Sequence, residues 1–154
     1  YKKNKKIFIK LKKILPKFVR IFPVDKTQIS DAILVNDQNL KKIIKIIHKE
    51  IRKKMFIFLK KNKNKKIIVL DIPLLLENKL NRKKDILVFV QSKKSDILKN
   101  LEKRVNFNKK LYNKFKNIQL PLDYKKKKSN FIIKNKFTKK SVKSGVQEIL
   151  NQIK

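Results

Sequence analysis

Residues 66–77 of the chain read Lys66-Ile67-Ile68-Val69-Leu70-Asp71-Ile72-Pro73-Leu74-Leu75-Leu76-Glu77. The unbroken apolar run before Asp71 is typical of a buried parallel strand, because such a strand is covered on both faces. Ligands of α/β proteins collect at the carboxyl ends of parallel strands. An acid at that place, followed by a proline, three leucines and a second acid, predicts the wall of a pocket rather than a solvated loop.

Two later apolar runs, Ile86–Val90 and Asn130–Ile133, also predict short strands. Apolar residues at helical spacing fill most of the remaining chain, and strands separated by helical crossovers pair in parallel. The order of elements therefore predicts an α/β sandwich with a parallel sheet. The first helix is expected at about residues 3–21, where Pro16 ends or kinks it. The starts expected for the later helices are, in chain order, Asp25 or Thr27, Asn36 or Asp37, Ser92 or Ser95 (for a helix that reaches Val105), Asn106 or Asn108, Pro121, and Thr138 or Ser141.

The length of 154 residues fits a single domain with a real core. Within it we expect a helical block at about residues 3–61 and an α/β region at 66–154. The absence of cysteine excludes disulfides and thiolate metal sites, and a single histidine excludes a multi-histidine metal cluster. Without a long apolar run or a signal-peptide pattern, the sequence predicts a soluble protein of the cytoplasm.

The formal net charge of +34 raises the question of nucleic-acid binding. Lysines are spread over every predicted helix and loop rather than gathered in one stripe. Isoleucine and asparagine are abundant too, and these three residue types share A/T-rich codons. Codon composition therefore accounts for the charge better than a dedicated nucleic-acid site, and we expect only non-specific electrostatic binding to nucleic acid. A basic nucleic-acid-binding protein stays open as an alternative.

The chain has one glycine, Gly145, and one methionine, Met55, and its first residue is Tyr1. The phosphate loop of nucleotide-binding proteins, G-x-x-x-x-G-K-[ST], needs two glycines, so this sequence cannot contain it. The Rossmann fingerprint is excluded for the same reason. We therefore expect that the natural start, the phosphate loop and at least one central strand precede Tyr1.

The run from Ile67 to Glu77 resembles the Asp-x-Pro-Leu-Leu-Phe-Glu signature of dephospho-coenzyme A kinases, which belong to the P-loop kinase superfamily. The resemblance extends over about residues 3–152. Its further points are Ile29-Ser30-Asp31, Ile33-Leu34 and His48-Lys49 upstream, and Arg104, Gln119, Lys125 and Ile132-Ile133-Lys134-Asn135 downstream.

The resemblance implies a P-loop-kinase-like three-layer sandwich that lacks its N-terminal P-loop strand, so that residues 1–154 form a single incomplete kinase domain. Residues 3–61 would form a helical acceptor-binding insert and residues 94–126 the lid helices. The implied activity is transfer of the γ-phosphate of ATP, with Mg²⁺, to the ribose 3′-hydroxyl of dephospho-coenzyme A. We expect the 154 residues alone to be inactive.

The resemblance also implies roles for individual residues. Asp71 would orient Mg²⁺, directly or through water, and Arg104 would neutralise charge on the transferred phosphoryl group. A helix cap or salt bridge for Asp71, and a solvated helix face for Arg104, are the structural alternatives. The acceptor side would be formed by His48, Pro73, Leu74, Leu75 and Glu77, and the nucleotide side by Gln119, Lys125 and Asn135. Glu77 could instead pair with a lysine.

The sequence also departs from the family pattern. Lysine follows His48 where the family has proline, Ser129-Asn130 replaces an alanine-aspartate pair, and Asn100 replaces the first lid arginine. Nearby lysines lack the bidentate fork of that arginine, so one phosphate contact is in doubt. Another nucleotide or nucleoside kinase of the superfamily is a further alternative, and the oligomeric state is open.

Overall fold

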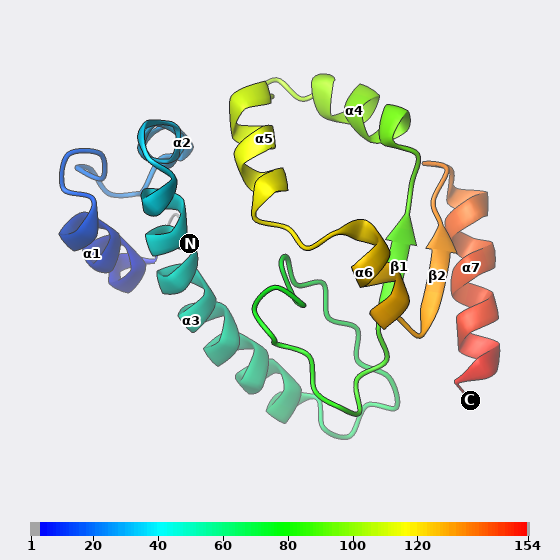
Figure 1. Cartoon of the computed structure of the whole chain (residues 1–154). Coiled ribbons are helices and arrows are strands. Elements are labelled where there is room, and N and C mark those ends of the chain that lie inside the picture. Colours follow the sequence, from blue (N-terminus) through cyan, green and yellow to red (C-terminus); the bar gives the residue numbers. More distant parts are fainter. Residues whose placement is uncertain (1–3, 154) are drawn as a thin grey trace. The chain divides into compact units, whose positions relative to one another are not determined.

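The computed structural model describes residues 4–153, which divide into two compact units, Tyr1–Ile72 and Pro73–Lys154. The elements, labelled in Figure 1, are α1 (Lys5–Ile14), α2 (Lys26–Val35), α3 (Asp37–Lys61), β1 (Val88–Gln91), α4 (Lys94–Glu102), α5 (Lys109–Asn117), α6 (Leu122–Lys128), β2 (Phe131–Lys134) and α7 (Lys139–Gln152). Among these helices, none combines the length and the apolar character that a membrane span requires.

The first unit is helical, with α1 and α2 both packed against the long helix α3. Side-chain caps begin the helices where the sequence predicts: Asp25 accepts a hydrogen bond at the start of α2, and Asn36 accepts one from the Gln38 N–H at 2.8 Å. The chain leaves α1 at Leu15, immediately before Pro16, as predicted. The predicted start at residue 3 lies outside the described residues. The buried side chains of this unit include Ile7, Leu11, Leu15, Val19, Val24, Ile29, Ala32, Ile33, Leu40, Ile43 and Met55.

The prediction of a buried strand at residues 66–71 is wrong. This segment has no regular secondary structure, and Ile67 and Val69 are 47% and 82% exposed. A strand is stable only when a neighbour satisfies its backbone N–H and C=O groups. The described part of the first unit contains no strand to act as that neighbour. The sheet of the described residues consequently has two strands rather than the predicted three.

The second unit contains the sheet, in which β1 and β2 pair in parallel with Val88 opposite Phe131 and Val90 opposite Ile133. Figure 1 shows the two strands side by side, with α7 beside β2. Asn130 extends the pairing beyond the strand ends, because its side-chain Oδ1 accepts the Leu87 N–H at 2.8 Å. The predicted parallel pairing of these two segments, and hence the α/β class, is confirmed.

Most of the helix starts predicted in this unit are confirmed, and one is wrong. Asn108 caps α5, Pro121 directly precedes α6, and Thr138 caps α7. Helix α4 instead begins after Lys93, which makes no side-chain cap hydrogen bond, and it ends at Glu102. Val105, predicted to lie on this helix, is 99% exposed in the turn beyond it. Two or three residues of apolar spacing are too few to fix where a short helix ends.

Gly145 allows α7 to approach β2 closely. A Cβ atom on residue 145 would lie 3.1 Å from Cγ2 of Ile133, and Ile133 is 7% exposed. The missing side chain therefore sets the distance between helix and sheet. Glycine costs a helix about 1 kcal/mol relative to alanine, so its place inside α7 needs a packing reason, and the contact with Ile133 supplies one.

Gly145→Val is expected to destabilise the second unit by about 1–3 kcal/mol, because the added methyl groups overpack the contact with Ile133. Ser144→Val is the matched control, since residue 144 is exposed on the same helix and should change stability by less than about 0.5 kcal/mol. Amide hydrogen exchange of β1 and β2 measures both changes. Equal protection in the two variants would contradict the packing role of Gly145.

Candidate functional site

The loop that follows Ile72 is a tight, internally hydrogen-bonded turn. The carbonyl oxygen of Leu74 accepts from the backbone N–H of Asn78 at 3.1 Å and from its side-chain Nδ2 at 2.8 Å. The Leu80 N–H donates to the Leu75 carbonyl at 3.0 Å, and Leu80 is buried. Leu74 has a φ of 56°, in the left-handed region that costs a non-glycine residue about 1–2 kcal/mol. We call residues 73–80 the proline loop.

Glu77 ties the proline loop to the segment that enters α6. Its Oε1 atom accepts the Leu120 N–H at 3.0 Å and lies 2.6 Å from Nζ of Lys125. Lys125 also donates to Oε1 of Gln119 at 3.1 Å. The side chains of Glu77 and Lys125 are only 10% and 17% exposed. Glu77, which the resemblance assigns to the acceptor, therefore meets Gln119 and Lys125, which it assigns to the nucleotide, in one polar cluster.

The cluster holds Glu77 in its charged form. Burial alone would raise the pKa of Glu77, but the hydrogen bond from Lys125 and the backbone N–H groups of Glu77 and Leu120 outweigh it, so that the pKa lies below its ordinary value. The Leu120 N–H and the Lys125 ammonium group both contact Oε1, so this oxygen already has two partners. The pairing with a lysine, left open by the sequence, is the interaction that the structure contains.

The remaining predicted residues of the second unit are exposed or half-buried. Asn135 directly follows β2, where its N–H donates to the Gln91 carbonyl at 2.8 Å and its Oδ1 accepts the Phe137 N–H at 2.7 Å. Arg104 is exposed in the turn after α4 rather than on the helix itself. Pro73 is exposed, whereas Leu74 and Leu75 are half-buried. Asn135 thus lies at the carboxyl edge of the sheet.

Asp71 and His48 belong to the first unit. Asp71 is exposed in the irregular segment that ends this unit. His48 is 7% exposed on α3, and its Nδ1 atom is buried without a hydrogen-bond partner among residues 4–153. A buried imidazole nitrogen without a hydrogen-bond partner is energetically unfavourable. Among the predicted acceptor contacts, His48 is the one on a helix of the first unit, and its side chain is buried there.

Sequence reasoning missed two residues that shape the site. Asn78 caps the proline loop, and Asn130 joins the starts of the two strands. Asparagine is common in turns because its side chain replaces backbone hydrogen-bonding partners. The position of Asn78 directly after Glu77, in a stretch without glycine, was the available signal for a turn.

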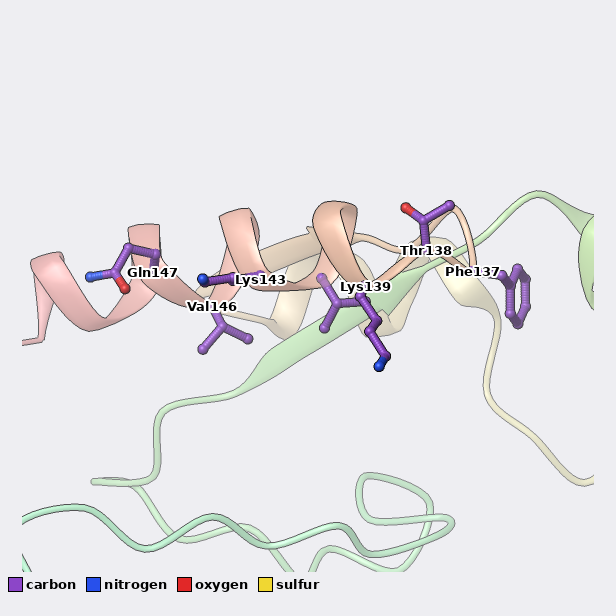
Figure 2. A pocket seen from close by; sticks show the side chains of 7 residues that line it. Phe137, Thr138, Lys139, Lys143, Val146 and Gln147 are labelled. Carbon is purple, nitrogen blue, oxygen red and sulfur yellow. The ribbon is translucent and has the colours of Figure 1, made fainter.

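The hollows of the second unit include one beside α7 and one beside the proline loop. Figure 2 shows one beside the start of α7, where Lys139 and Val146 point to the same side of the helix. It has a volume of about 530 Å³, and none of the predicted site residues lines it. The other hollow has a wall that includes Leu76 and Glu77. Among the described residues, no three His, Asp or Glu side chains gather into a group that could hold a metal ion by themselves.

Glu77→Gln is expected to lower the free energy of unfolding of the second unit by about 1–2 kcal/mol at pH 7, because the amide still accepts from Leu120 but loses the charge that pairs with Lys125. Since the pKa of Glu77 is lower in the folded state, the pair stabilises the fold above the unfolded carboxyl pKa of about 4.3, and that contribution is lost as the pH falls through the folded value.

The difference between wild type and Glu77→Gln should therefore shrink in amide-exchange measurements as the pH falls through the lowered folded pKa of Glu77, and it should disappear once Glu77 is protonated. Glu148→Gln, which removes an exposed carboxylate of α7, is the control and should have little effect at either pH. A difference that persists unchanged in acid would contradict the charged pair.

Comparison with known proteins identifies the family. A family model described as dephospho-CoA kinase matches residues 22–140. The dephospho-CoA kinase of Wolbachia pipientis wMel is 32% identical over 155 residues, which cover 99% of this chain and 79% of the relative. That of Rickettsia typhi is 32% identical over 121 residues, covering 79% and 62%, and that of Bacillus anthracis 29% over 137 residues, covering 84% and 66%. The chain belongs to the dephospho-CoA kinase family.

Proposed function

We propose that the chain acts in the ATP-dependent phosphorylation of the 3′-hydroxyl of dephospho-coenzyme A, the last step of coenzyme A synthesis. The observation that carries the proposal is the family match over residues 22–140, which contains the whole Asp71–Glu77 motif. The reaction is a phosphoryl transfer, in which catalysis is mostly positioning and charge neutralisation.

The proline loop suits the acceptor side of this reaction. Pro73 is exposed and Leu74 and Leu75 are half-buried, so apolar atoms remain available on a backbone that its own hydrogen bonds fix. A wall that is formed before binding loses little entropy when the acceptor binds. In this proposal Glu77 acts through the loop, which it anchors to Leu120 and Lys125, and His48 supports the helical acceptor region from within.

The phosphoryl side requires cations and a carboxylate. Mg²⁺ in kinases is held by one or two carboxylates, phosphate oxygens and water rather than by an all-protein cage. A single exposed carboxylate at Asp71 fits that donor set, and Mg²⁺ bound there would neutralise phosphate charge. Arg104 would stabilise charge on the transferred group, with Gln119, Lys125 and Asn135 on the nucleotide side. Lys125 would serve the nucleotide indirectly, because Glu77 and Gln119 already engage its ammonium group.

We further propose that the α/β unit is part of a P-loop-kinase three-layer sandwich in the cytoplasm. The parallel pairing of β1 and β2 supports this fold type. Because the sequence has one glycine, the loop that cradles the triphosphate is proposed to come from residues other than these 154.

A polypeptide of residues 1–154 alone is expected to form no coenzyme A above background from dephospho-coenzyme A and Mg²⁺-ATP, because it has no triphosphate cradle. A hybrid that adds the part of the Wolbachia pipientis relative outside the matched 155 residues should form coenzyme A. A coupled assay of ADP release, with product identified by chromatography, measures both. Robust turnover by residues 1–154 alone would overturn the proposed division of the active site.

In that hybrid, Asp71→Asn is expected to lower kcat about 10²-fold or more, because the neutral amide holds Mg²⁺ poorly. The loss should be partly relieved by raised Mg²⁺, since the defect is one of metal affinity. Glu148→Gln removes an exposed carboxylate of α7 and should leave kcat within about twofold. An Asp71→Asn variant with unchanged kcat and Mg²⁺ dependence would show that Asp71 has only a structural role.

A further inference from the structure

A hollow of about 530 Å³ opens in the second unit at the amino edge of the sheet. Its wall includes Leu87, which directly precedes β1, and Asn130, which directly precedes β2. The proposed nucleotide contact Asn135 follows β2 at the opposite, carboxyl edge. Ligands of α/β proteins usually collect at that carboxyl edge, so the amino-edge hollow is a separate place on the fold.

The hollow carries an excess of positive charge. Four cations and two carboxylates line it. Both carboxylates are already engaged, since Glu77 pairs with Lys125 and Asp85 lies 2.7 Å from Arg82. Lys79, Lys83 and Lys128 have no carboxylate within salt-bridge distance in the described part of the chain. Three lysines around one concave surface favour an anion with several negative charges.

The lining of the hollow also includes aliphatic and aromatic side chains. Leu76, Leu87 and Leu120 contribute aliphatic surface, and Tyr124 contributes a ring that is 46% exposed. The ammonium group of Lys128 lies 5.9 Å from the centre of that ring, which places a cation beside an aromatic face. An exposed aromatic face beside cations is the arrangement with which proteins hold phosphorylated ligands that also carry a planar ring.

The walls of the hollow are fixed by contacts within the protein. Lys79 has a left-handed backbone with a φ of 50°, and its N–H donates to the Leu76 carbonyl at 3.1 Å. Next to it, the Arg82 N–H donates to Asp85 Oδ2 at 2.9 Å. The volume lies within the range of about 300–1,000 Å³ that is common for small-molecule sites. A preformed cavity of this size binds a ligand with little reorganisation.

We propose that this amino-edge hollow binds a small phosphorylated ligand with a planar ring, of the nucleotide class. Lys79, Lys83 and Lys128 contact its phosphate groups, and Tyr124 stacks on its ring. The site goes beyond the proposed kinase function, because Asp71, Arg104 and Asn135 are not among the residues that line the hollow. Glu77 does line it, but its carboxylate already pairs with Lys125. It also differs from diffuse attraction by a cationic chain, since it requires three particular lysines and one ring.

The test uses Mg²⁺-free ADP as the probe and two-dimensional ¹H–¹⁵N spectra of the 154-residue chain at fixed ionic strength. ADP is expected to shift the signals of Lys79, Tyr124 and Asn130, with smaller shifts at Gln91 and Asn135. Uncharged adenosine should bind at least tenfold more weakly, because it lacks the phosphates. Shifts confined to the carboxyl edge, or equal binding of adenosine, would overturn the proposal.

A pair of triple variants separates the site from diffuse charge. Lys79→Gln, Lys83→Gln and Lys128→Gln together are expected to weaken ADP binding at least tenfold. The matched control changes the exposed α3 lysines Lys41, Lys42 and Lys45 to glutamine, which removes the same charge from the other unit and should alter the Kd by less than about twofold. Equal weakening in the two triple variants would show that only the net charge matters.

Tyr124→Leu tests the ring contact without removing charge. It is expected to weaken ADP binding about tenfold while leaving the binding of inorganic pyrophosphate unchanged, because stacking on an aromatic side chain acts on the base alone. The side chain is 46% exposed, so the fold should tolerate the change, and unchanged spectra of β1 and β2 verify this. Unchanged ADP affinity in a folded Tyr124→Leu variant would contradict the assignment of the ring.

Discussion

The contact between Glu77 and Lys125 is the interaction on which the second unit depends most. Glu77 lies in the proline loop and Lys125 lies on α6, 48 positions further along the chain, so the pair fixes two distant segments against each other. Burying two charges is expensive unless they are paired and hydrogen-bonded, and here the Leu120 N–H and the Gln119 side chain complete the pairing. Removing one partner would leave the other charge buried alone.

This pair influences both edges of the sheet. Helix α6 leads directly into β2, whose far end is followed by Asn135 at the carboxyl edge. Leu76, Glu77 and Lys79 of the proline loop line the amino-edge hollow, together with Leu87, which directly precedes β1. A shift of the loop relative to α6 would change the lining of that hollow. The same contact consequently positions the proposed acceptor wall and shapes the proposed second site.

The sequence predicts which segments form helices and strands better than it predicts which segments pack or pair against one another. Parallel strands were predicted at residues 86–90 and 130–133 and are found at 88–91 and 131–134. The caps Asn36, Asn108 and Thr138 were each one of two predicted alternatives, because short-range spacing and capping chemistry determine where helices begin. The strand at 66–71 was predicted wrongly, because an apolar run shows that a segment suits a strand but not whether a partner strand is beside it.

The partners of individual site residues were also beyond sequence reasoning. Lys125 is one of four consecutive lysines, and only the direction in which α6 presents each side chain selects the one that meets Glu77. The amino-edge hollow draws its wall from the proline loop, residues 81–87, α6 and Asn130, and no local pattern reveals that these segments converge. By contrast, the place of Asn135 at a strand end was predictable, since it depends on β2 alone.

The scarcity of glycine has a consequence for the backbone itself. Three residues other than glycine adopt left-handed conformations: Leu74, Lys79 and Phe137, with φ values of 56°, 50° and 58°. Glycine adopts this conformation without steric cost. Glycine codons are rich in guanine, and a coding sequence biased toward adenine and thymine seldom offers them. Nucleotide bias in a gene can thus appear as conformational strain in its product. In such a lineage, strained turns lower the free energy of unfolding, and the protein then tolerates fewer further destabilising mutations.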